Sequence, residues 1–170
     1  MSDLDLQRDG VDAIIQQWNT VRPDLDVSPM AVVGRLSRAS RLLERSVKDT
    51  LGAQGVEPWE FDVLATLLRS GPPHVLSAGA LSSAAMVSSA ALTNRIDRLV
   101  EKGLVDRALD PDHRRRMLIS LTEQGLRLVN EAADHHLANE RTQLAGLTDD
   151  EQQQLATLLR RLLVSLGDEA

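Results

Sequence analysis

The chain has 170 residues, enough for one domain with a substantial core or two small lobes, and its hydrophobic and charged fractions of 42% and 26% are ordinary for a globular protein. It contains no cysteine, which excludes disulfides, thiol catalysis and zinc–thiolate sites. The formal net charge of -6 argues against generic polyanion binding, although nucleic-acid contact requires only one locally basic face. No run approaches the roughly 18 apolar residues of a membrane span, and the acidic first residues do not fit a secretory signal, so we expect a cytoplasmic protein that does not interact with a membrane.

Helical periodicity dominates the first half of the chain. Apolar residues at helical spacing predict a short helix within 9–21 and a long helix within 28–52. Pro58 begins a third helix that is apolar around most of its circumference, and we therefore expect it to be buried. Ser77 caps a short helix of small residues, and a tight turn separates it from an amphipathic helix that ends at Gly103.

The strand signal of the chain lies after this amphipathic helix. Two apolar segments, 104–110 and 116–122, flank a turn-forming "PDHRR" and predict a β-hairpin. Helical pattern resumes over 123–145, and a capping box at Thr148 opens a last helix that carries a continuous leucine stripe over 155–166. The order of helix, short helix, turn, amphipathic helix and hairpin predicts a winged helix-turn-helix.

A block of three arginines marks the tip of the predicted hairpin. A helix fits the major groove of B-DNA, and a hairpin beside it can place cations on the phosphates. Arginine suits this task because its guanidinium stays charged and bonds phosphate oxygens through two N–H groups. Asp110 and Asp112 are expected to brace neighbouring arginines and fix the hairpin shape. The alternative is a solvated turn, since short charge runs on hairpins are common.

The stretch "SSAALTNRIDRLVEKGLVDRALDPDHRRRMLISLTEQG", residues 88–125, resembles the recognition helix, wing and following helix start of the MarR family of transcriptional regulators. The likeness covers nearly the whole chain from residue 30 onward, although His113 stands where that family often has an acidic or small residue. It implies a mostly α fold with a small β-hairpin wing. A winged helix-turn-helix lobe would span 56–122, and helices within 9–52 and 123–166 would interlock two subunits into a homodimer.

This resemblance implies a repressor that binds a near-palindromic double-stranded DNA operator, and we expect no catalytic role, cofactor or metal. The expected DNA contacts come from the recognition helix and the wing. They are Ser88, Ser89, Thr93, Asn94, Arg98, Arg114, Arg115 and Arg116.

A narrower resemblance concerns "WNTVRPDLDVSPMAVVGRL", which is similar to the urate-responsive branch of the family with its extra N-terminal helix. That likeness implies a site for a small anionic aromatic ligand, urate-like or phenolic, formed by Trp18, Asp62 and Arg95. The residues also fit a simpler interpretation, in which Asp62 and Arg95 form a buried ion pair and Trp18 fills the core.

Other patterns leave two alternative functions open. Asp97 and Glu101 on the recognition helix would repel phosphates, which favours a protein-interaction adaptor, and a small-molecule binding protein without a DNA-reading role is the other alternative. The adjacent His135 and His136 diverge by about 100° on a helix, so they do not fit a shared metal ion.

Overall fold

The computed structural model describes residues 7–85, 89–113 and 115–168, with the backbone alone for residues 89 and 90. The chain divides into two units, 1–46 and 47–170, which are treated separately below. In the described part of the chain, no helix is long and apolar enough to cross a membrane.

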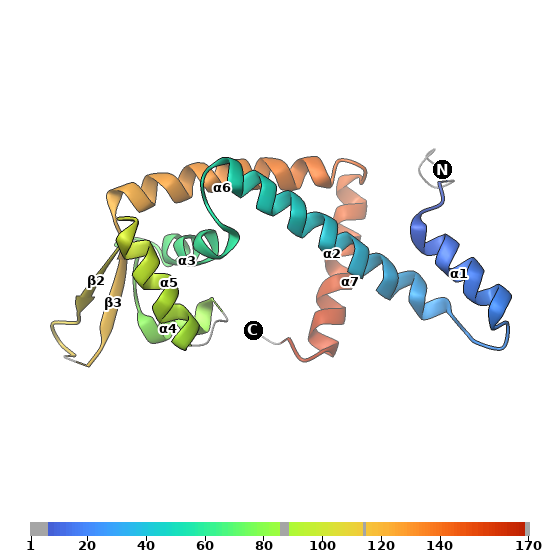
Figure 1. Ribbon diagram of the computed structural model, residues 1–170, viewed down its shortest axis with the longest axis horizontal. Coiled ribbons are helices and arrows are strands. Elements are labelled where there is room, and N and C mark those ends of the chain that lie inside the picture. The colour runs from blue at the N-terminus through green and yellow to red at the C-terminus, as the bar shows by residue number, and fades with distance from the viewer. Residues whose placement is uncertain (1–6, 86–88, 114, 169–170) are drawn as a thin grey trace. The chain divides into compact units, whose positions relative to one another are not determined.

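The first unit contains helix α1 (Gly10–Val21) and the larger part of helix α2 (Ser28–Ala53), coloured blue in Figure 1. Asp9 caps α1 by accepting hydrogen bonds from the backbone N–H groups of Val11 and Asp12. The Asp12 carboxylate in turn accepts a hydrogen bond from the Asp9 backbone N–H. Arg35 of α2 donates to Asp9 at 2.8 Å and to Asp12 at 2.7 Å, and Val11 is buried beneath this network. The predicted N-terminal helix is therefore held on α2 by charge and by an apolar contact.

The second unit is built around helix α3 (Pro58–Arg69), the helix predicted to be buried. Val63, Leu64 and Leu67 of α3 are fully shielded from solvent. They form one core cluster with buried residues of helices α4 (Ala78–Ala84), α5 (Ser89–Glu101) and α6 (Glu123–Gln143) and of the sheet. The core therefore lies directly under the elements expected to contact DNA.

The described residues form an antiparallel sheet of three strands in the order β1 (Val75–Ser77), β3 (Met117–Leu121), β2 (Val105–Leu109). Strands β2 and β3 are the predicted hairpin, with Val105 opposite Leu121 and Leu109 opposite Met117. Strand β1 was not predicted, because its few residues are too short to produce an alternating pattern. It adds to the other side of β3 and joins the start of the helix-turn-helix to the wing.

Two helices complete the second unit, and each of them begins at a threonine cap. Thr122 caps α6, and Thr148 opens α7 (Asp149–Ser165) with the predicted capping box. Within this single chain α7 has no buried residue among its described positions, although leucines run along its length. Those exposed leucines are Leu155, Leu158, Leu162, Leu163 and, just beyond the helix, Leu166.

Candidate nucleic-acid interface

Helix α5 has an apolar inner face and a polar outer face. Leu92, Ile96 and Leu99 are buried at 2%, 3% and 0% exposure, and they fix the helix on the core. Thr93 and Asn94 are exposed on the other side of the same turns. The helix is therefore fixed on the core and presents short polar side chains outward. A helix that reads base edges needs such an outward polar face.

The wing tip is organised by Asp110, as predicted. Its Oδ1 atom accepts hydrogen bonds from the backbone N–H groups of Asp112 at 2.9 Å and His113 at 3.3 Å. Its Oδ2 atom lies 3.6 Å from the guanidinium of Arg116. The expectation of a brace is therefore confirmed for Asp110. Asp112 was expected to act in the same way, but it contributes its backbone N–H to the turn, and none of the ion pairs between described residues includes its carboxylate.

Some of the other predicted DNA contacts are exposed in the structure, and others lie outside the described residues. Arg115 and Arg116 are exposed at the wing tip, and Arg98 is exposed on α5. Ser88 and Arg114 lie outside the described residues, and Ser89 begins α5 without a described side chain. The hairpin that carries the wing is labelled β2 and β3 in Figure 1.

An ion pair connects the recognition helix to the wing. Asp97 of α5 accepts a hydrogen bond from Arg107 of β2 at 2.7 Å. The aspartate that would repel DNA phosphates is therefore neutralised by a neighbouring cation. This contact removes part of the argument for an adaptor, and it was not evident from the sequence because the two residues lie on different elements.

The candidate ligand residues of the second unit do not form the simple ion pair considered above. The guanidinium of Arg95 lies 5.8 Å from the centre of the Trp59 ring, and none of the described ion pairs joins it to Asp62. Asp62 is exposed at the mouth of a cavity of about 350 Å³. The cavity is also lined by Phe61, Ala65, Thr66, Arg69, Ala84, Ala85 and His136.

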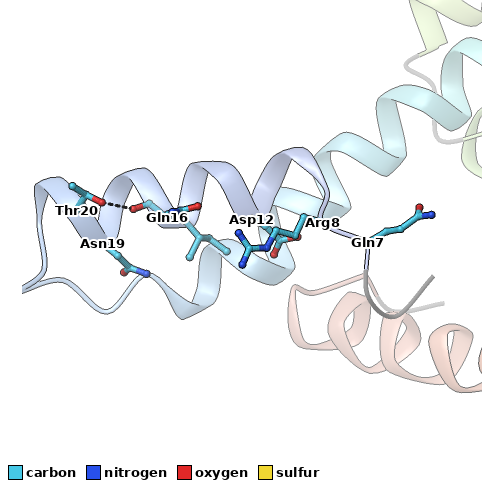
Figure 2. Close-up of a pocket in the computed structure, with 7 residues that line it drawn as sticks. Gln7, Arg8, Asp12, Gln16, Asn19 and Thr20 are labelled. Atoms are coloured by element: carbon cyan, nitrogen blue, oxygen red, sulfur yellow. Dashed lines mark hydrogen bonds between the residues drawn. The ribbon is translucent and has the colours of Figure 1, made fainter. Parts of the chain in front are cut away.

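Trp18 belongs to the first unit, where its side chain is 40% exposed on α1. Another face of α1 forms an open hollow of about 620 Å³ whose lining includes Arg8, Asp12 and Gln16 (Figure 2). The lining comes from α1 and the residues just before it, so the hollow is the solvated polar face of one helix.

His136, one of the two adjacent histidines, contacts Glu140 and Phe61. Its Nε2 atom lies 3.2 Å from Glu140 Oε1, and its ring centre lies 5.0 Å from that of Phe61. Among the described residues, no cluster of His, Asp or Glu side chains has the arrangement of a metal site.

These elements define a winged helix-turn-helix, in which a supported polar helix lies beside a cationic hairpin. A sequence model described as the MarR family matches residues 54–116. The transcriptional regulator PecS of Dickeya dadantii is 40% identical over 152 residues, which cover 89% of this chain and 92% of PecS. The chain therefore belongs to the MarR family of DNA-binding transcriptional regulators.

Solved structures share this fold. A mutant MarR from Escherichia coli, complexed with operator DNA, has 25% identity and a TM-score of 0.69, and the match covers 86% of this chain and 97% of that protein. BpsR of Bordetella bronchiseptica, whose DNA binding is regulated by 6-hydroxynicotinic acid, has 26% identity and a TM-score of 0.67, and the match covers 77% of this chain and 91% of BpsR.

Proposed function

We propose that this protein is a ligand-responsive repressor that binds a near-palindromic operator as a homodimer and leaves it when a small anionic aromatic molecule binds. The observation that carries the DNA-binding part is the exposed face of α5 beside the exposed arginines of the wing. The Escherichia coli relative that shares this fold was solved with operator DNA, which supports the same use of the helix here.

The two parts of this interface have different tasks in the proposal. Thr93 and Asn94 of α5 read base edges in the major groove, because short polar side chains on a helix reach hydrogen-bonding groups there. Arg114, Arg115 and Arg116 bind phosphates and fix the position of the lobe without selecting sequence. The DNA-binding lobe spans 56–122, and the helices within 9–52 and 123–166 form the dimer.

The proposed ligand is a flat anion, with Trp18 as a stacking wall, Asp62 as acceptor for a ligand N–H and Arg95 as the anion-binding group. The cavity at Asp62 supports the part of this proposal that concerns Asp62, and the regulation of BpsR by an aromatic acid supports the kind of ligand. Arg95 belongs to the recognition helix, so an anion that engages its guanidinium acts directly on the element that reads DNA. The ligand must favour the conformation that does not bind DNA, or it shifts nothing.

Titration of a preformed complex tests the proposal. A labelled duplex from the region upstream of the gene for this chain is bound, and urate, salicylate or 6-hydroxynicotinate is added while anisotropy is followed. We expect release by at least one of these anions, and weaker release from Trp18→Phe, Asp62→Asn and Arg95→Gln proteins. Benzamide at equal concentration is the uncharged control.

Each failure has a separate meaning. If the parent binds the duplex and the variants respond to the anion like the parent, the ligand site lies elsewhere. If no duplex is bound even at low salt, DNA recognition itself is refuted, and the adaptor becomes the better hypothesis. Since a regulator of this kind acts on chromosomal DNA, we place it in the cytoplasm.

A further inference from the structure

Two adjacent residues at the start of α3, Trp59 and Glu60, contact cations of the recognition helix. Arg98 lies over the Trp59 ring with its guanidinium carbon 4.8 Å from the ring centre, and Arg95 lies 5.8 Å from the same centre. Glu60 binds Lys102, which directly follows α5, with 2.5 Å between Oε1 and Nζ. The start of one helix therefore touches the cationic side of the other over about two turns.

The Trp59 ring is a fixed support for these arginines. It is half-buried and packs against the main core cluster, so its position is set by the interior of the lobe. A guanidinium within about 6 Å of an indole centre is attracted by the negative face of the ring. Arg98, which is otherwise exposed, is therefore held in a defined direction before DNA is present.

Glu60 adds a second attachment at the far end of the recognition helix. Its side chain is 1% exposed, and its Oε2 atom accepts a hydrogen bond from the Glu57 backbone N–H at 3.1 Å, which completes the capping box of α3. A buried carboxylate requires a partner, and Lys102 supplies it from the end of α5. The carboxylate is fixed by its own helix and in turn fixes the end of the recognition helix.

We propose that Trp59 is a positioning residue for DNA recognition, which acts by holding the guanidinium of Arg98 ready for the DNA, while Glu60 holds the end of the same helix. The proposal rests on the DNA-binding function proposed above. An arginine loses rotamer freedom when it binds, and a side chain that is already ordered loses less. Trp59 therefore raises affinity without contacting DNA itself.

A double-mutant cycle separates positioning from a general structural role. We expect Trp59→Leu to weaken binding of the upstream duplex by about three- to tenfold, and Trp59→Phe to weaken it less, because phenylalanine keeps a smaller cation-binding face. In an Arg98→Ala protein, Trp59→Leu should change affinity by less than about twofold, since the group it positions is gone. A matched cycle with Arg115→Ala is the control, and there the two losses should multiply.

The results have distinct consequences. Equal losses from Trp59→Leu with and without Arg98 would overturn the positioning role and leave Trp59 as a core residue. Binding of the duplex by the parent is the reference measurement, and its absence would refute the proposed function instead. Circular dichroism checks folding; if Trp59→Leu does not fold, the same cycle is measured with Trp59→Phe, and zero coupling to Arg98 then overturns the inference.

Discussion

The charges of the recognition helix are arranged by neighbouring side chains. Asp97 is paired with Arg107, and Arg98 lies against Trp59, while Asn94 stays exposed on the outer face. An acidic chain can therefore present cations on this face, because Asp97 is engaged in an ion pair and Asp110 is engaged in the wing turn and with Arg116. Local pairing, rather than net charge, decides what this face attracts.

Affinity and specificity should separate between the wing and the helix. Arg115→Ala should weaken binding to every duplex and reduce the salt dependence by a slope of about one, because one phosphate contact is lost. Asn94→Ala should instead relax base preference by about 1–3 kcal/mol at one position of each half-site. Anisotropy titrations of operator and scrambled duplexes over a salt series measure both. Normal binding by Arg115→Ala at every salt concentration would contradict the assignment of the wing.

Some of these residue roles were predictable from sequence and others were not. Asp110 stands beside the arginines in a turn-forming segment, so its bracing role follows from local chemistry. Trp59 and Arg98 are far apart in the sequence, and their contact depends on how α3 and α5 pack. A partly buried tryptophan near a helix start is by itself typical of a core residue, so the sequence carried no signal for its partners.

At the scale of elements, local rules predicted most helices well. The capping box at Thr148 lies where the sequence placed it, and the hairpin strands pair as expected. Strand β1 was not predicted from the sequence, because its hydrogen-bonding partner is β3, which lies far along the chain. Secondary structure that is created by a tertiary partner leaves no periodic pattern in a segment this short.

Close approach between α6 and the loop before the wing gives a stability prediction. A Cβ on Gly125 would overlap the carbonyl oxygen of Leu104, and the Gly125 N–H is fixed to Thr122 Oγ1 at 2.9 Å. Gly125→Ala should therefore lower the free energy of unfolding by about 1–3 kcal/mol. Gly52→Ala on α2 is the control, because a Cβ there meets no atom within 4 Å. Urea denaturation with equal losses in both variants would contradict this account.

Docking of α1 on α2 should weaken in acid. Partial burial raises the pKa of Asp9, but hydrogen bonds from the Asp12 and Val11 backbone and from Arg35 outweigh it, so the pKa lies below the ordinary 3.8. The Asp9 backbone N–H and Arg35 likewise lower the pKa of Asp12. Because both folded pKa values are depressed, the stabilisation is present above pH 3.8 and is lost as the pH falls below it.

Trp18 lies on α1 with 40% exposure, so we expect its emission to follow this transition. In a Trp59→Phe protein its emission should shift toward that of exposed tryptophan as the pH falls below about 4, where the carboxylates become protonated. Arg35→Met should loosen α1 already at neutral pH and so remove most of the acid-dependent change. An identical acid transition in the Arg35→Met protein would show that these ion pairs do not hold α1 in place.

At the scale of the whole molecule, exposed apolar surface is the main unexplained feature of a single chain. Leu158 and Leu163 of α7 are 59% and 48% exposed, and Val32 and Val33 of α2 are 60% and 64% exposed. Apolar surface in such stripes is rarely left in water by a soluble protein. A second copy of the chain is the expected cover, which agrees with the dimers typical of the family.

The proposed dimer leads to predictions about assembly and about operator geometry. Leu158→Glu with Leu162→Glu should produce monomers in sedimentation velocity and should remove most specific DNA affinity, because one recognition helix then reads one half-site. Gln153→Glu with Gln154→Glu adds the same charge to α7 without replacing leucine, and it should leave the dimer intact.

For the parent protein, a two-fold axis requires half-sites roughly 10 base pairs apart. Inserting about five base pairs between them turns one half-site to the opposite side of the duplex and should abolish cooperative binding. A parent protein that sediments as a stable monomer at micromolar concentration, or that binds equally well after the insertion, would rule out this assembly.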